Sequence, residues 1–173
     1  MLVRELVAAM DRWDKVGIWA FPLQTLKRLF PEGTRALLKS LATHSRAGLV
    51  ERVVRGLYVN PRARCLPSDV LSALVSFLRP WDFNYLSLES ALSEAGWISQ
   101  IPSRLTLMTT GRSQTFDTSY GTVEFVHTTQ KAPQLRDEWV FDARRKLAIA
   151  TPSRALRDLK RVGRNLDLIV HQK

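Results

Sequence analysis

Residues 23–58, LQTLKRLFPEGTRALLKSLATHSRAGLVERVVRGLY, decide which fold we expect for the first part of this chain. Apolar side chains recur at helical spacing in two segments of this stretch, 23–30 and 34–47. Between them, Pro31 has no N–H to continue the first helix, and Gly33 can adopt a positive φ. The stretch therefore predicts two helices joined by a tight turn.

A β-hairpin is predicted directly after the second helix. Residues 49–59 are rich in β-branched side chains, and Arg55-Gly56 suits the reversal of the chain. Thr34 is a good N-cap for the helix that precedes this hairpin. Helix, turn, helix and hairpin in this order are typical of a winged helix-turn-helix, and residues 2–13 predict a further helix that packs on it.

The second helix of this pattern has an apolar side and a cationic side. At about 100° per residue, the apolar side collects Leu37, Leu38, Leu41 and Ser45. The opposite side is free to enter the major groove of DNA, where Arg and Lys reach phosphates or guanine and Thr reaches phosphates or thymine methyls. The residues predicted to bind DNA are Thr34, Arg35, Lys39, Thr43 and Arg46 on the helix, with Arg52 and Arg55 on the hairpin. An ordinary solvated helix is the alternative, and the turn before it and the hairpin after it favour DNA binding.

The distribution of charge favours an anionic partner. The 173 residues carry a formal net charge of +10, and residues 1–65 hold 12 Lys and Arg against 5 Asp and Glu. Most of the excess positive charge therefore lies on the segment with the helix-turn-helix pattern. This is expected of a protein that displaces counterions from a polyanion such as DNA.

The composition predicts a cytoplasmic protein. Cys65 is the only cysteine, so no intrachain disulfide can form, and we expect it to be a small buried residue without chemical reactivity. Acidic residues at positions 5, 11 and 14 do not suit a signal peptide. No apolar stretch is long enough to cross a membrane, so no membrane partner is expected.

Two domains are expected, with the boundary in the proline- and arginine-containing segment 61–67. We place the winged helix-turn-helix in residues 1–64 and a small α+β domain in residues 65–173. In the second domain, the periodicity predicts helices over 68–79, 86–95 and from Pro152 onward, and strands over 105–109, 115–118, 122–128, 138–141 and 147–150. Short alternating runs separated by turns predict antiparallel pairing of these strands.

Neither a catalytic constellation nor a metal site is predicted, and no cofactor is expected. The histidines, at positions 44, 127 and 171, have no partner at metal-binding spacing. Asp117 and Glu124 flank a hairpin as an acidic nuclease pair can, but no lysine follows Glu124. A nuclease or transferase is nevertheless an alternative, and it would act through Ser87, Ser90, Asp117 or His127.

Further cations follow in the second half of the chain. A second basic cluster is formed by Arg144, Arg145, Lys146, Arg154, Arg157, Lys160, Arg161 and Arg164. This cluster can extend the DNA footprint, face an acidic protein or form a solvated helix face. Gly111-Arg112-Ser113 and Arg104 have the composition of a phosphate site, for which an exposed β-turn is the simpler interpretation.

Four groups of residues bear on the family of the chain. The first part ends in Gly48-Leu49, Arg52-Val53 and Arg55-Gly56-Leu57-Tyr58. The second part contains Tyr85-Leu86-Ser87-Leu88-Glu89-Ser90-Ala91-Leu92 with Gly96, then Thr109-Thr110-Gly111-Arg112, and then Ala150-Thr151-Pro152-Ser153-Arg154-Ala155-Leu156-Arg157-Asp158. In this order they resemble the AbiEi-type antitoxins of type IV toxin-antitoxin systems, a group associated with abortive phage infection. Ser153-Arg154 departs from the Glu-Lys that is usual in that family.

The resemblance implies a transcriptional autorepressor that binds inverted repeats in double-stranded operator DNA upstream of its own operon. It also implies that the protein counteracts a cognate nucleotidyltransferase-like toxin, with the N-terminal domain on DNA and the C-terminal domain neutralising the toxin. The oligomeric state stays open between a monomer and a weak dimer that pairs on the inverted repeats. The alternative outside this family is a protein-interaction module whose winged helix docks a partner without binding DNA.

Overall fold

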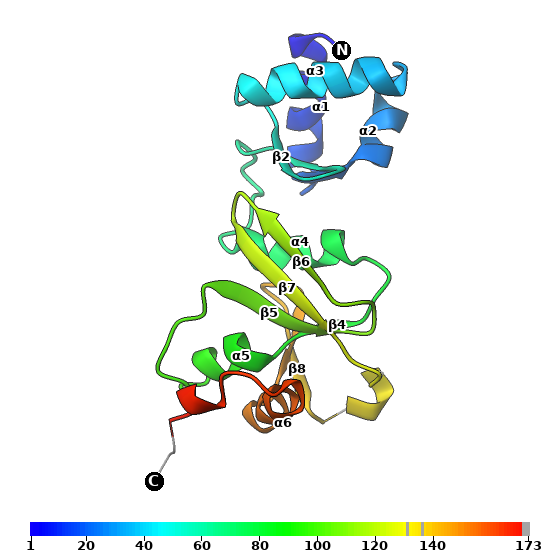
Figure 1. The fold of residues 1–173 in the computed structure, drawn as a ribbon. Coiled ribbons are helices and arrows are strands. Elements are labelled where there is room, and N and C mark those ends of the chain that lie inside the picture. The colour runs from blue at the N-terminus through cyan, green and yellow to red at the C-terminus, as the bar shows by residue number, and fades with distance from the viewer. Residues whose placement is uncertain (131, 136, 171–173) are drawn as a thin grey trace. The chain divides into compact units, whose positions relative to one another are not determined.

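The computed structural model describes residues 1–130, 132–135 and 137–170 (Figure 1). The chain forms two compact units, Met1–Val70 and Leu71–Lys173. The sequence suggested a boundary after residue 64, whereas the structure keeps the following residues with the first unit. The Asp14 carboxylate holds this segment by accepting hydrogen bonds from the backbone N–H groups of Arg64, at 3.0 Å, and Cys65, at 2.9 Å.

The first unit combines three helices with a small sheet. In chain order its elements are α1 (Val3–Asp14), β1 (Ala20–Pro22), α2 (Leu23–Leu29), α3 (Thr34–Arg46), β2 (Glu51–Val54) and β3 (Leu57–Val59). The sheet has the order β1-β3-β2 with antiparallel pairing throughout, so the buried strand β3 lies in the middle. The core between helices and sheet is formed by Leu6, Met10, Phe21, Leu26, Phe30, Leu37, Leu41, Val50 and Tyr58.

The turn before α3 differs from the prediction. Gly33 is the N-cap residue with φ −58° and ψ 141°, and Thr34 is the first helical residue. The predicted positive φ at Gly33 and the predicted N-cap role of Thr34 are therefore wrong. The reason is that Phe30 already leaves α2 in an extended conformation, so the chain reverses without a left-handed residue.

The hairpin after α3 reverses where the sequence predicted. Arg55 and Gly56 connect β2 to β3, and Gly56 has φ +86°, which an L side chain rarely adopts. The register shifts between Arg52 and Val54, which is a β-bulge in β2.

The second unit is built on a six-stranded sheet. Its helices are α4 (Val70–Leu78), which starts at the unit boundary, α5 (Leu88–Glu94) and α6 (Pro152–Val162), with short 3-10 turns at Ala132–Leu135 and Leu166–Leu168. Its strands are β4 (Asn84–Leu86), β5 (Arg104–Thr109), β6 (Gln114–Thr118), β7 (Gly121–His127), β8 (Trp139–Asp142) and β9 (Leu147–Ala150). The strand order is β6-β7-β5-β4-β9-β8. The α+β class that the sequence predicted is therefore observed.

The pairing in this sheet is mixed, which corrects the prediction of antiparallel strands. β5 pairs with β7 and β4 pairs with β9 in parallel, while the other three pairings are antiparallel. In both hairpins, β6–β7 and β8–β9, the second strand docks on the centre of the sheet. Sequence alternation identifies a hairpin but does not say which of its two strands docks, so the parallel pairs could not be predicted.

Two helices cover the centre of this sheet. α5 and α6 pack against each other, and they contact β5 and β9, respectively (Figure 1). Pro152 begins α6 as predicted, and the Thr151 hydroxyl caps the helix by accepting a hydrogen bond from the Arg154 N–H. Within the ranges that the structure describes, no helix combines the length and the apolar character that a membrane span requires.

Candidate nucleic-acid interface

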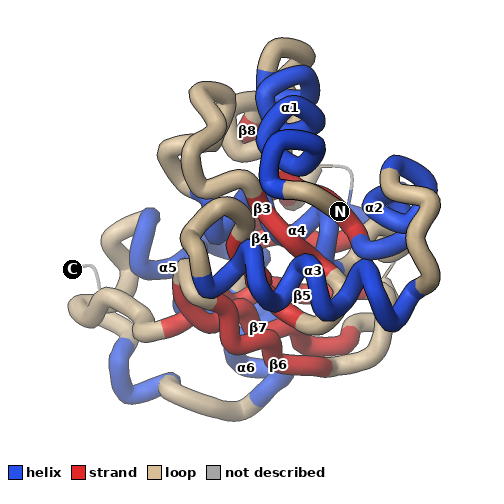
Figure 2. The backbone as a smooth tube through the Cα atoms, turned by 90° about the horizontal axis from the view of Figure 1, so that it is seen from above, coloured by secondary structure: helices blue, strands red, loops and turns tan. Residues whose placement is uncertain are grey.

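α3 buries one side and exposes the other. Leu37, Leu41 and His44 are buried, and all seven residues predicted to bind DNA are exposed. In the view from above, neither α1 nor α2 covers α3 (Figure 2). The inward position of His44 was not predicted; its Nε2 lies 3.1 Å from the carbonyl oxygen of Met1.

The predicted apolar side of α3 needs one correction. Leu38 is 40% exposed and Ser45 is half-buried, so neither belongs to the buried stripe with Leu37 and Leu41. On the helical wheel, Leu38 lies about 100° from Leu37, at the edge of the buried stripe. Its hydrophobicity led to its assignment to the core, although its angular position places it at the margin.

The cations of this face have no acidic partners in the described part of the chain. No ion pair with a described residue is formed by any of the five, which are Arg35, Lys39, Arg46, Arg52 and Arg55. Five uncompensated cations on one small unit create a positive potential that attracts a polyanion. Thr34 and Thr43 are both exposed, but at about 100° per residue they lie on opposite sides of α3, so only Thr43 shares the cationic side. The Thr43 hydroxyl donates to the Lys39 carbonyl oxygen at 3.2 Å.

A groove of about 770 Å³ joins α3 to the hairpin. It is lined by Pro22, Leu23, Gln24, Leu38, Leu41, Ala42, Ser45, Arg52, Arg55, Gly56 and Tyr58. The structure therefore brings the two hairpin arginines next to the exposed side of α3. Arg35, Lys39 and Arg46 occupy the adjoining, outermost strip of the helix.

The predicted second basic cluster is divided among separate ion pairs. Arg145 binds Glu94 at 2.7 Å and Asp142 at 2.8 Å, and these bonds raise the pKa of its guanidinium. Arg157 pairs with Glu138, and Arg154 and Arg164 are paired as described below. Among the described residues, the members whose side chains form no ion pair are Arg144, Lys146, Lys160 and Arg161. Acids from other elements therefore neutralise part of the predicted cluster.

Arg154 belongs to a buried polar network. Its guanidinium lies 2.5 Å from the carboxylate of the fully buried Asp158 and 3.1 Å from that of Glu138. Asp158 also accepts hydrogen bonds from the Tyr85 hydroxyl, at 3.1 Å, and the Ser87 hydroxyl, at 2.8 Å. Burial, together with the charge of Asp158, raises the pKa of Tyr85 well above its usual value, so the phenol stays a proton donor.

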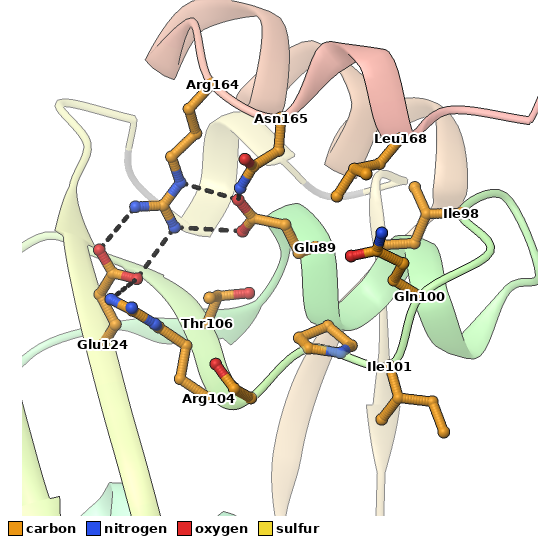
Figure 3. A pocket seen from close by; sticks show the side chains of 12 residues that line it. Glu89, Ile98, Gln100, Ile101, Arg104, Thr106, Glu124, Arg164, Asn165 and Leu168 are labelled. Atoms are coloured by element: carbon orange, nitrogen blue, oxygen red, sulfur yellow. Dashed lines mark hydrogen bonds and ion pairs between the residues drawn. The ribbon is translucent and has the colours of Figure 1, made fainter.

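A pocket of about 440 Å³ in the second unit contains another ion-pair cluster (Figure 3). The Arg164 guanidinium lies between two carboxylates and binds Glu89 at 2.8 and 3.1 Å and Glu124 at 2.7 and 2.9 Å. Asn165 donates a further hydrogen bond to Glu89, and Arg104 lies 3.5 Å from Glu124. The carboxylates of this pocket are thus occupied by the chain's own cations.

The electrostatics of Glu89 follow from this arrangement. Burial raises the pKa of Glu89, but the hydrogen bonds and the charge of Arg164 outweigh it, so the net pKa lies below its usual value. Glu89 is therefore ionised at neutral pH. The cluster ties the segment after α6 to α5 and β7, which is a structural role.

The candidate phosphate site is not assembled. Arg104 begins β5, whereas Gly111-Arg112-Ser113 follows the other end of this strand. The Gly111 carbonyl oxygen lies 2.7 Å from Nδ1 of His127, and the Arg112 carbonyl oxygen accepts a hydrogen bond from Arg79. The turn is held by these contacts and does not converge with Arg104.

The residues considered for catalysis each form hydrogen bonds to other groups. Ser87 donates to Asp158, whereas Ser90 bonds to the backbone of β5. Asp117 accepts from the Thr122 hydroxyl at 2.9 Å, and His127 lies against Gly111. Within the ranges described, no group of three or more His, Cys, Asp and Glu residues could hold a metal ion. His171 lies outside the described residues.

Cys65 is half-buried, not fully buried as predicted. Burial raises the pKa of its thiol to about 11, and a hydrogen bond with the Asp14 carboxylate acts in the same direction. The sulfur is therefore a protonated, weakly nucleophilic group at neutral pH.

The sequence was compared with models of known protein families and with curated proteins. No family model matches it, and the search of curated proteins gives no match.

Proposed function

We propose that this protein is a DNA-binding antitoxin and transcriptional autorepressor that acts in the cytoplasm and is not an enzyme. In this proposal its first unit binds inverted repeats in its own promoter. The single observation that carries the proposal is the set of five exposed cations on α3 and the β2–β3 hairpin, none of which has an acidic partner among the described residues.

The arrangement of the first unit supports a winged helix-turn-helix. The order α1-β1-α2-α3-β2-β3 and the antiparallel sheet β1-β3-β2 match what such a domain requires. In this reading α3 is the recognition helix, which enters the major groove, and the hairpin is the wing. Arg52 and Arg55 then lie beside α3, where they can reach the phosphates that flank the groove.

The antitoxin part of the proposal depends on the resemblance to the AbiEi-type family. Two motifs that are far apart in the sequence meet in the second unit, because Tyr85 and Ser87 both donate to Asp158. The two motifs are therefore parts of one buried hydrogen-bond network. The partner proposed for this unit is a nucleotidyltransferase-like toxin encoded next to the antitoxin gene.

Fluorescence anisotropy with the DNA immediately upstream of the gene tests the proposal. We expect wild-type protein to bind this DNA more tightly than a scrambled duplex of the same composition. Arg35→Ala and Lys39→Ala should each weaken binding, by about 1–3 kcal/mol where the side chain reads a base and by less where it contacts a phosphate.

Arg12→Ala is the matched control. Arg12 is an exposed cation of the same unit, but it lines a different groove, between α1 and the turn before α3. Its removal changes net charge by the same amount as Arg35→Ala and should leave affinity almost unchanged. Equal binding by all of these proteins would reject α3 as the DNA-contacting helix.

Co-expression tests the antitoxin role separately. A toxic product of the adjacent gene should be neutralised by the 173-residue chain. The Arg35→Ala and Lys39→Ala variants should still neutralise it if the second unit is responsible. Capture of a partner that survives nuclease treatment, without any shift of the upstream DNA, would instead favour a protein-interaction module.

A further inference from the structure

The floor of the groove between α3 and the hairpin is apolar, although the groove is open to solvent. Leu38 is 40% exposed, and Ala42, one turn later on the same strip of α3, is also exposed. Both side chains line the groove together with Arg52 and Arg55 of the hairpin. The exposed Leu38 lies between the cations of α3 and those of the hairpin, and it leaves apolar surface in water. An occupant of the groove would bury this surface.

The cations on both sides of this floor limit what can occupy it. Arg52 and Arg55 form one border, and at about 100° per residue Arg35 and Arg46 lie on the other side of Ala42 along α3. No described acid pairs with any of these four arginines. The occupant must therefore present negative charge at its margins and an apolar group between the charges.

A DNA strand in the major groove has this combination. Its phosphates carry the charge, and the C5-methyl group of thymine is the one apolar group that base edges present in the major groove. Leucine and alanine have no donor or acceptor with which to read guanine, cytosine or adenine.

We infer that Leu38 and Ala42 contact thymine methyl groups, so that the DNA recognised by this chain has at least one thymine at a fixed position in each half-site. The inference rests on the proposed function and adds the base that α3 selects. Arg35, Lys39 and Arg46 then supply phosphate or guanine contacts around this apolar centre.

Replacing thymine by deoxyuracil tests this inference, because the exchange removes only the methyl group. Wild-type protein first selects its tightest ligand from random duplexes of about 20 base pairs, the length of two half-sites. Each thymine of that ligand is then replaced singly, and affinity is measured by anisotropy for wild type, Leu38→Ala and Val16→Ala. Val16 is an exposed apolar residue of the same unit that does not line the groove.

We expect wild type and Val16→Ala to lose affinity about fourfold for each buried methyl, at one or more positions per half-site. In Leu38→Ala the loss at one of these positions should disappear. The inference is overturned if no deoxyuracil weakens binding, or if Leu38→Ala shows the same losses as wild type.

The proposed function is judged by a different result of the same series. One outcome is that Arg35→Ala and Lys39→Ala weaken binding to the selected DNA, whereas no deoxyuracil replacement does. In that case only the inference on Leu38 and Ala42 fails. If selection enriches no duplex, or if binding does not depend on Arg35 and Lys39, the proposed function fails as well.

Discussion

Removal of Arg164 should destabilise the second unit strongly at neutral pH. The guanidinium makes four hydrogen bonds to Glu89 and Glu124, whose side chains are only 7% and 14% exposed. Without it, Glu124 keeps Arg104 at 3.5 Å, whereas Glu89 keeps no cation and retains the neutral Asn165. Breaking a fully buried pair costs about 3–5 kcal/mol, and since Arg164 is 30% exposed we expect Arg164→Ala to cost about 2–3 kcal/mol.

The pH dependence of this loss has a definite sign. In the wild type the pKa of Glu89 lies below its usual value, so its contribution to stability is full above about pH 4.3 and is lost as the pH falls through the folded-state pKa. In Arg164→Ala, burial persists without the cation, so the pKa of Glu89 should rise above its usual value. Protonation of Glu89 at lower pH then removes the unpaired buried charge of the variant. The difference in free energy of unfolding between wild type and Arg164→Ala should therefore shrink between neutral pH and about pH 4.

Urea unfolding at a series of pH values measures this deficit. Arg161→Ala is the matched control, because Arg161 is exposed, lies three residues away and pairs with no described acid. Its effect should stay within about 0.5 kcal/mol. The reasoning is refuted if Arg164→Ala is no less stable than Arg161→Ala at pH 7, or if the deficit is the same at every pH.

Three further predictions concern other parts of the chain. Cys65 has a thiol pKa of about 11, so in the folded protein it should react with iodoacetamide at pH 8 far more slowly than in the urea-unfolded protein. Asp14→Asn should accelerate the reaction of the folded protein, because it removes the carboxylate that helps to raise this pKa. Equal rates in folded and unfolded protein would contradict the burial of this thiol. Asp158→Ala leaves the buried Arg154 without its closest carboxylate and should cost about 3–5 kcal/mol in urea unfolding, whereas the exposed neighbour Lys160→Ala should be nearly neutral. Gly56→Ala forces a residue with a side chain to adopt a φ of +86° and should lower the free energy of unfolding by about 1–2 kcal/mol. Ala47→Gly should cost less, because it removes a side chain at the exposed end of α3 without adding strain. Equal losses in the two variants would argue against strain at the hairpin turn.

Local patterns predicted several elements because each has a strong signal of its own. α3 and α6 have apolar periodicity over more than ten residues, and Pro152 marks the start of α6. The Arg55-Gly56 reversal follows from the positive φ that glycine tolerates. Arg35, Lys39, Thr43 and Arg46 are exposed as predicted, because the 3.6-residue period fixes which side of α3 faces outward.

The remaining features depend on contacts that are distant in the sequence. β4 has only three residues, too few to show an alternating pattern, and its parallel pairing with β9 joins positions more than sixty residues apart. Arg154 and Arg157 of α6 and Arg164 after it were predicted to belong to one cationic cluster, because the sequence does not reveal that Glu138 and Glu89 approach them. Within α6, the spacing of i and i+4 would have allowed the Arg154–Asp158 pair to be inferred.

Leu38 shows how a residue of the candidate site was missed. Its hydrophobicity suggested a core position, whereas its angle on the helix places it at the edge of the buried stripe. Geometry therefore carries more information than residue type at the border of an amphipathic helix. The same border supplies the apolar floor of the groove.

The salt dependence of DNA affinity tests the central claim most directly, because it counts the cations that displace counterions. If all five cations of α3 and the hairpin contact phosphates, a plot of log affinity against log salt should have a slope of about −4 to −5, and Arg52→Ala with Arg55→Ala should make it shallower by about two. Arg12→Ala should leave the slope unchanged. A slope near zero for the wild type, or the same slope in the hairpin double variant, would contradict the assignment of this face to DNA.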